Sequence, residues 1–363
     1  MKICITILAL TVWLGCGSQE PPEGNPRIKT GHASGAGPRL GRDFSATNLV
    51  WIPGGTFKMG STNGEQDEQP VHNVKLNGFW IGKFEVTNVE FAAFIKATKY
   101  KTIAERQPKL EDFPGVPPES LKPGAIVFTP PKQDIPVHRL RDHGMFMAWW
   151  KYVHGASWEF PAGPGQPGVK TKPNYPVVHI AWYDAVKFCE WKTKITGVTH
   201  RLPTEAEWEF AARGGLKEKE YVWGTEQEPL GKPMANIWHG KFPVENTKKD
   251  GFYGTAPVGS FPVNGYGLHD MAGNVWEWCA DWYSPEYYRE SVVSNPKGPP
   301  VEKSRDPNEP GAKKRVQRGG SFLCSDLYCG AFRPARRMKT TPDTGMAHAG
   351  FRVLVEAAAP ATE

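Results

Sequence analysis

The sequence offers little material for long regular elements or for a membrane-spanning helix. Its 363 residues include 39 glycines and 34 prolines, which interrupt helices and favour turns. After the N-terminal segment, no stretch approaches the roughly 18 consecutive apolar residues that a transmembrane helix needs. Blocks of basic residues are missing too, and the formal net charge is only +6. We therefore expect short elements joined by ordered loops, and no nucleic-acid partner.

The N-terminus has the features of a bacterial lipoprotein signal. Lys2 precedes an apolar run that ends at Trp13, and Leu14-Gly15-Cys16 follows. We predict a signal peptide over residues 1–16 with Cys16 as the lipid-attachment site, and a flexible tether over residues 17–48. The working domain would then be anchored to a membrane of the bacterial cell envelope, facing the periplasm or the exterior. A signal cleaved elsewhere or a short membrane anchor is the alternative.

Helix and strand signals begin near residue 49. Thr87–Glu90 and Thr204–Glu207 are capping boxes, in which the threonine caps the first turn and the glutamate reaches back to it. A third helix is expected over residues 184–193, with Cys189 on its inward face. Strands are expected at residues 49–60 with a kink at Gly54-Gly55, and at residues 71–76, 79–86 and 175–180. Residues 101–175 read as a long insertion of ordered loop.

Four of the six cysteines lie beyond the signal, namely Cys189, Cys279, Cys324 and Cys329. An oxidising compartment favours pairing of an even set. Cys324 and Cys329 stand five residues apart, which suits a disulfide, two buried thiols or a metal-binding pair. Cu(I) is soft and accepts two thiolates, whereas zinc needs four ligands. Nearby arginines could lower the thiol pKa values and favour metal binding; these are Arg315, Arg318, Arg333, Arg336 and Arg337.

Asparagine, aspartate, glycine and aromatic residues dominate residues 221–283. Side-chain oxygens of this kind, together with backbone carbonyls in irregular loops, suit Ca²⁺. Asn-Gly and Asp-Gly pairs also form turns without any ion. Spacing alone leaves both interpretations open.

Several motifs together resemble one family. They are Gly54–Gly60, Arg201–Glu209, Gly265–Leu268, Gly273–Trp278, Arg318–Ser321 and Gly350–Arg352. These segments are similar to the formylglycine-generating enzyme (sulfatase-modifying factor) family, from about Val50 to Val355. More specific to its oxidases are Ser321–Cys329, Arg336-Arg337, Thr341–Asp343, Trp149-Trp150 and Gly155–Trp158.

The resemblance implies an α+β domain with an irregular, loop-rich, C-type-lectin-like fold over residues 49–356, followed by a tail at residues 357–363. It also implies a copper-dependent oxidase, expected to be monomeric, that acts on unfolded sulfatase precursors. Such an enzyme uses O₂ to convert the cysteine of a C-x-P-x-R segment into Cα-formylglycine. By the same resemblance, Cys324 and Cys329 would hold Cu(I).

Other roles carry over residue by residue. Ser321 and Trp276 would join the two cysteines in the catalytic site, and Trp158, Arg337 and His348 would contact the substrate. His348 stands where some relatives carry asparagine. One structural calcium site would use Asn236, Asp250 and the carbonyls of Ile237 and Phe252. A second would use Asp270, Glu277 and the carbonyls of Gly273 and Val275.

The chain departs from the family pattern at two cysteine positions. Val353 occupies the place where some members have a cysteine that pairs with the equivalent of Cys189, so Cys189 is expected to be free. Cys279 lies outside the known pattern and could be buried or pair with Cys189. A non-catalytic binding or structural lipoprotein on the same fold is the alternative function. An iron-dependent sulfoxide synthase would need a His-bearing helical domain before residue 50, and is not expected.

Overall fold

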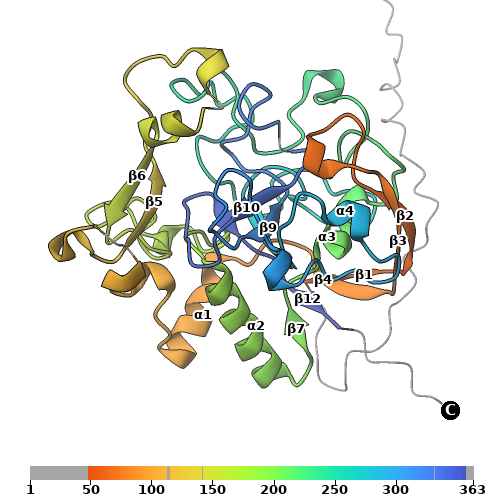
Figure 1. Cartoon of the computed structure of the whole chain (residues 1–363), viewed down its shortest axis with the longest axis horizontal. Helices are drawn as coiled ribbons and strands as arrows, with labels where there is room; N and C mark the ends of the chain where they lie inside the picture. The colour runs from red at the N-terminus through yellow and green to blue at the C-terminus, as the bar shows by residue number, and fades with distance from the viewer. Residues whose placement is uncertain (1–47, 113–114, 141, 331, 357–363) are drawn as a thin grey trace, which may run out of the picture. The chain divides into compact units, whose positions relative to one another are not determined.

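Short strands connected by long loops form most of the structure (Figure 1). The computed structural model describes residues 48–112, 115–140, 142–330 and 332–356, all within one unit that spans residues 34–363. The predicted signal peptide with Cys16, the tether up to residue 47 and the tail from residue 357 lie outside the described residues. No helix in the described ranges is long and apolar enough to cross a bilayer.

The first four-stranded sheet joins the beginning of the domain to its end. Its strand order is β1-β4-β12-β7. The strands are β1 (Leu49–Ile52), β4 (Phe79–Gly82), β12 (Leu354–Val355) and β7 (His200–Arg201). All pairs are antiparallel, and Leu354 of β12 pairs with Ile81 on one side and Arg201 on the other. The last strand therefore lies inside the sheet, between strands from the first and middle parts of the chain.

The second sheet places the residues around the cysteine pair. Its order is β10-β9-β8-β11. The strands are β8 (Trp276–Trp282), β9 (Arg315–Arg318), β10 (Met338–Thr340) and β11 (Ala349–Gly350). β8 and β9 are antiparallel, with Glu277 opposite Arg318, whereas β11 runs parallel to β8. The sheet therefore brings Trp276, the segment after β9 and the residues before β11 to one region.

Two hairpin-like pairs complete the β-structure. They are β2 (Gly55–Met59) with β3 (His72–Leu76), and β5 (Gly124–Phe128) with β6 (Trp150–His154). The predicted strand at residues 49–60 is thus two strands in different sheets, divided at Pro53-Gly54. β5 and β6 lie within the insertion predicted as loop, which otherwise contains short 3₁₀ turns.

The helices begin where the capping boxes predict. The helices are α1 (Asn88–Thr98), α2 (Trp182–Thr196), α3 (Glu205–Arg213) and α4 (Tyr287–Glu290). Thr87 and Thr204 each accept a hydrogen bond from the third helical amide, as predicted. α1 and α2 lie side by side (Figure 1), and Phe91 stacks on Phe188 at 5.9 Å between ring centroids.

The predicted strand at residues 175–180 is wrong. The segment is connected to its neighbour by a single bridge between Thr87 and Pro176. Pro176 has no amide hydrogen to donate, and His179 adopts a left-handed conformation with φ of +58°, so a regular ladder cannot continue. The predicted strand at residues 79–86 likewise ends early, at Gly82.

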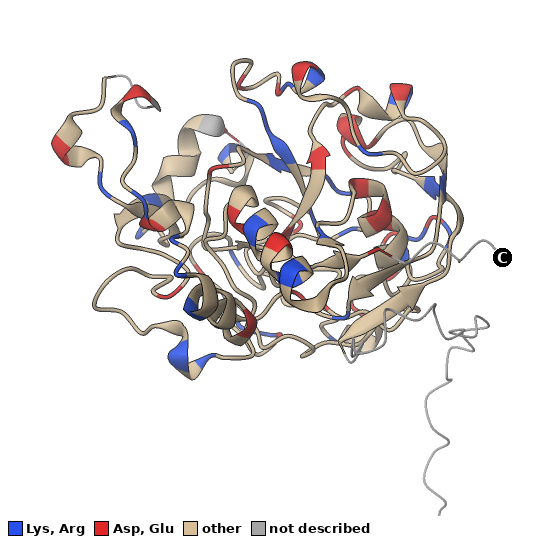
Figure 2. Cartoon of the chain, turned by 90° about the horizontal axis from the view of Figure 1, so that it is seen from below, with Lys and Arg blue, Asp and Glu red and all other residues tan. Residues whose placement is uncertain are grey.

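Charged residues are interspersed along the ribbon (Figure 2), and several of them form a buried network at α3. Glu205 accepts hydrogen bonds from Arg318 at 2.6 Å and from Arg337 at 2.7 Å. Arg213 donates to Glu209 at 2.7 Å. Burial disfavours the charged form of Glu205, yet Arg337 and Arg318 hold its pKa below the ordinary value. The network therefore fastens α3 to β9 and to the segment before β10.

Replacing Glu205 with glutamine should destabilise the protein strongly. The change leaves Arg318 and Arg337 without their common carboxylate, and breaking a buried pair costs about 3–5 kcal/mol. Urea unfolding measures the loss. The control is Glu190→Gln, because Glu190 pairs with Lys187 while 56% of its side chain is exposed; its loss should be about 0–1 kcal/mol. Equal losses in the two variants would contradict the role of the network.

Candidate active site

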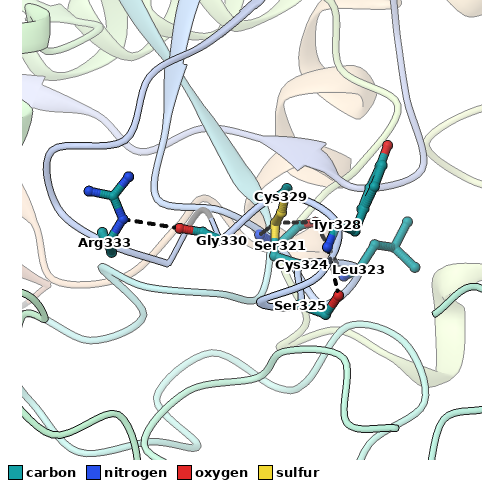
Figure 3. The surroundings of a disulfide bond; sticks show 8 residues. All are labelled: Ser321, Leu323, Cys324, Ser325, Tyr328, Cys329, Gly330 and Arg333. Carbon is teal, nitrogen blue, oxygen red and sulfur yellow. Dashed lines mark hydrogen bonds between the residues drawn. A yellow bond between two sulfur atoms is a disulfide. The ribbon is translucent and has the colours of Figure 1, made fainter. Parts of the chain in front are cut away.

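The two cysteines occupy a tight loop that follows β9. Gly319 and Gly320 have positive φ values of 96° and 78°, and a Cβ on Gly319 would meet the ring of Trp208 at 3.0 Å, so the turn there requires glycine. Cys324 and Cys329 are joined as a disulfide, with their Cα atoms 5.4 Å apart (Figure 3). The structure thus shows the pair as a disulfide, one of the three states that the spacing left open.

Ser321 lies against Cys324, as expected. Its backbone N–H donates to the Cys324 sulfur at 3.3 Å, and its Oγ lies 3.9 Å from the same atom. Cys324 is buried with 1% exposure, while Cys329 is half-buried and Leu327 between them is 50% exposed. The pair is therefore buried at Cys324 and accessible from the solvent at Cys329.

The donor set suits a soft ion of low coordination. Among the described residues, no group of three or more histidine, cysteine, aspartate or glutamate side chains is placed to hold a metal. Zinc would need such a group, whereas two thiolates suffice for Cu(I). The reduced pair therefore fits Cu(I).

The five arginines near the pair have other partners, which corrects the idea that they act on the thiols. Arg318 and Arg337 bind Glu205, while Arg333 and Arg336 face Glu68 at 2.8 and 3.6 Å. Arg315 lies between the rings of Trp182 and Trp282. Since the Arg337 side chain is fully buried, it presents no exposed group for the predicted contact with a substrate.

The other three residues predicted for the active site lie at different places in the fold; they are Trp276, His348 and Trp158. Trp276 is buried in the hydrophobic cluster that also contains Cys324. His348 is buried, its ring stands 4.8 Å from that of Trp150, and its carbonyl accepts the Trp276 amide at 2.8 Å. Trp158 belongs to another cluster, where it packs on Phe91 at 5.5 Å. Trp158 is thus part of the hydrophobic core around α1 and α2.

The first predicted calcium set lies on one loop. The Asp250 carboxylate accepts the amides of Ile237 and Phe252, each at 3.0 Å. Asn236 uses its amide nitrogen to bind Gly254 and Asn274, which leaves its Oδ1 available to an ion. Burial raises the pKa of Asp250, so a cation that kept it ionised would relieve an unfavourable charge.

The second set is arranged differently from the prediction. Both oxygens of Glu277 accept hydrogen bonds from Arg352, each at 2.6 Å. Asp270 accepts the Gly259 amide at 2.7 Å and also interacts with the Glu85 side chain. Beside it lies Glu85, which sequence reasoning missed; burial, with Asp270 and Glu277 nearby, raises its pKa well above the ordinary value. Within the described part of the chain, Glu85 Oε2 is buried without a hydrogen-bond donor, so this oxygen and the Asp270 carboxylate are the ones that could bind an ion.

The calcium sets are linked to the cysteine loop through the backbone. Asn274 donates its side-chain amide to Glu85 at 3.0 Å, and its carbonyl accepts the Phe322 amide at 2.9 Å. The Trp238 amide donates to the Cys324 carbonyl at 2.9 Å. Any ion that orders residues 236–274 therefore also orders the cysteine loop.

Comparison with known proteins identifies the family. Residues 38–357 match the model of the sulfatase-modifying factor enzyme 1-like domain. The chain belongs to the sulfatase-modifying factor family. A formylglycine-generating enzyme of Thermomonospora curvata is 44% identical over 88% of this chain and 97% of its own. The inactive Cα-formylglycine-generating enzyme 2 of Bos taurus is 37% identical over 87% and 90%.

A solved structure confirms the fold prediction. PvdO from Pseudomonas aeruginosa aligns with a TM-score of 0.59 and 24% identity over 85% of this chain and 94% of its own. The predicted α+β, loop-rich architecture of the sulfatase-modifying factor fold is therefore confirmed.

The two remaining cysteines of the domain are not joined to each other. Cys189 and Cys279 are both free and buried, so they do not pair with each other. Burial raises the pKa of Cys189 to about 12 and that of Cys279 well above its ordinary value. Both are therefore unreactive thiols.

His348, a buried histidine, should make the fold sensitive to acid. Burial lowers its pKa to about 3, and that of neighbouring His179 to about 4. The unfolded chain takes up these protons below its pKa of about 6.5, so stability is complete above that pH and is lost as the pH falls towards 4. Exchanging His348 for asparagine should reduce the loss between pH 7.5 and pH 5 by about 2 kcal/mol.

Thermal unfolding at the two pH values measures this effect. His138→Asn, at an exposed position, is the control and should follow the wild type. An unchanged acid sensitivity in His348→Asn would show that His348 is not held neutral in the folded protein.

Proposed function

We propose that the chain is a formylglycine-generating enzyme. It converts the cysteine of a C-x-P-x-R segment in an unfolded sulfatase precursor into Cα-formylglycine, with Cu(I) as cofactor and O₂ as electron acceptor. The observation that carries this proposal is the adjacent pair of sulfurs in a loop reachable from the side of Cys329. The names of the similar enzymes support it.

The chain's own residues prepare the pair for this chemistry. Reduction of the disulfide frees two thiolates, and the Ser321 amide 3.3 Å from the Cys324 sulfur stabilises negative charge there. Cu(I) held by the two thiolates would supply a soft centre at which the substrate thiolate and O₂ meet. The Ser321 hydroxyl can donate a hydrogen bond to the sulfur or to oxygen beside it.

The substrate would approach while still extended. Exposed Leu327 and half-buried Cys329 form the accessible side of the loop, and a folded sulfatase would hide its cysteine from them. The predicted lipoprotein signal ending at Cys16 would place the enzyme in the cell envelope, where it could meet exported sulfatases before they fold.

Formylglycine formation should require both cysteines. We expect the purified full chain, reduced and loaded with Cu(I), to convert a C-x-P-x-R peptide in air, seen by mass spectrometry as an aldehyde. Cys324→Ser and Cys329→Ser should abolish conversion and binding of one Cu(I), measured by chelator competition. Ser321→Ala, which removes a neighbour of the pair, should lower activity by about 10–100-fold.

Cys189→Ala is the matched control, because Cys189 is a buried thiol in another cluster. It should keep copper binding and activity. Absence of conversion by the reduced, copper-loaded wild type in air would instead favour the alternative of a non-catalytic binding lipoprotein.

We further propose two structural calcium ions, one at Asn236 and Asp250 and one at Asp270 with Glu85. Calcium at about 100 times its dissociation constant should stabilise the fold by about 2.7 kcal/mol per site, measured as a higher melting temperature than in EGTA. Glu85→Gln should lose one ion by elemental analysis and part of this increase. Asp134→Asn, whose side chain is 63% exposed, should keep both. Equal melting temperatures with and without calcium would contradict the proposal.

A further inference from the structure

A row of aromatic rings leads from the cysteine loop to the surface. Tyr328, next to Cys329, stacks on Phe242 with 4.2 Å between centroids and 8° between planes. Phe242 lies 5.4 Å from Trp238, and Trp238 lies 6.0 Å from Tyr253. Trp238 is 3% exposed and Tyr253 is 46% exposed. The row thus begins beside the sulfurs and ends in solvent.

A second connection joins the same row to the pair. The Trp238 amide donates to the Cys324 carbonyl at 2.9 Å, so the indole is one short backbone segment from that cysteine. Figure 3 shows Tyr328 beside the pair, with its ring standing to one side of the sulfurs. The row therefore contacts the loop at both cysteines.

We propose that Tyr328, Trp238 and Tyr253 carry single electrons from the protein surface to the cysteine pair. The proposal rests on the proposed function, because only a site that uses O₂ generates an oxidant there. When that oxidant forms without a substrate thiol to consume it, the available targets are the two cysteines. Their oxidation to sulfinic or sulfonic acid is irreversible. A supply of electrons from the surface protects them.

The residue types suit this role. Tyrosine and tryptophan are the most easily oxidised aromatic side chains, whereas Phe242 only shortens the gap between them. The indole N–H of Trp238 is buried with no hydrogen-bond acceptor among the described residues. Oxidised Trp238 therefore keeps its proton and stays strongly oxidising. Tyr253 can release its phenol proton to water, so the radical settles there.

The electrons balance as follows. Tyr253 loses one electron and one proton, the proton to water, and becomes a neutral radical. The electron reduces the oxygen-derived oxidant at the cysteine pair, which takes up one proton there. A soluble thiol then returns a hydrogen atom to Tyr253, and two thiyl radicals combine to form a disulfide. The transfer of two electrons along the row thus consumes two thiols and removes two oxidising equivalents.

Core packing alone also places aromatic rings at these distances, and the two explanations differ at Tyr253. Packing gives no role to the exposed Tyr253 hydroxyl, whereas electron transfer requires it. Tyr253→Phe removes only that oxygen and is therefore the decisive variant. Tyr183→Phe is the matched control, since Tyr183 is 45% exposed and its ring contacts Trp182, which is not part of the row.

The experiment incubates the copper-loaded full chain in air without peptide, with a nitroso spin trap, and locates the adducts by peptide mass spectrometry. We expect an adduct on Tyr253 in the wild type and in Tyr183→Phe, and none at that position in Trp238→Phe. When peptide is added after increasing times of this incubation, Tyr253→Phe should have the wild-type rate at time zero but lose activity several-fold sooner, with sulfinic acid at Cys324 or Cys329.

The proposal is overturned if formylglycine forms normally while Tyr253 carries no adduct, or if Tyr253→Phe inactivates at the wild-type rate. Failure to form formylglycine in any variant would remove the proposed function, and this proposal with it. The peptide assay and the adduct assay therefore separate the two failures.

Discussion

The position of the cysteine loop depends on one buried asparagine. Asn274 adopts a left-handed conformation with φ of +58°, which asparagine tolerates better than most residues. Its amide donates to Glu85 and accepts from Asn236 and from the Ala256 backbone. Its backbone carbonyl accepts a hydrogen bond from the amide of Phe322, two residues before Cys324. An amide both donates and accepts, so neither aspartate nor leucine could make this set of bonds.

Around this residue the fold depends on polar interactions more than on regular secondary structure. The loops from residue 221 to residue 275 contain little helix or strand, so their backbone groups are satisfied by turns and by side chains such as those of Asp250, Asn264 and Asn274. The buried ion-pair network at α3 likewise satisfies backbone groups, on the other side of β9. The two cysteines are thus held between a buried ion-pair network and a group of carboxylates and amides.

Helices and strands were predicted well where one short sequence motif determines the structure. The capping boxes at Thr87 and Thr204 gave both helix starts, because the hydrogen bonds involved lie within four residues. The prediction for residues 175–180 failed because the apolar pattern was given more weight than Pro176, and because nothing local reveals the left-handed conformation of His179. The pairing of β12 between β4 and β7 also has no local signature, since its partners are distant in sequence.

The site was predictable only in part. The spacing of Cys324 and Cys329 indicated the pair, and the structure brings the sulfurs together. The arginines appeared to surround it, but their carboxylate partners on α3 and η1 (Gln66–Glu68) are distant in the sequence and were not foreseen. Glu85 was missed for the same reason, although a glutamate between Phe84 and Val86 was a local hint of a buried charge.

The interior place of β12 has a consequence for the order of folding. Its two residues complete the first sheet, yet they lie within ten residues of the C-terminus. β12 pairs with β4 and β7, which lie far earlier in the chain, and such distant pairing is slow. We therefore expect the first sheet to close late in folding, after the helices and the β2–β3 pair, which depend on local contacts.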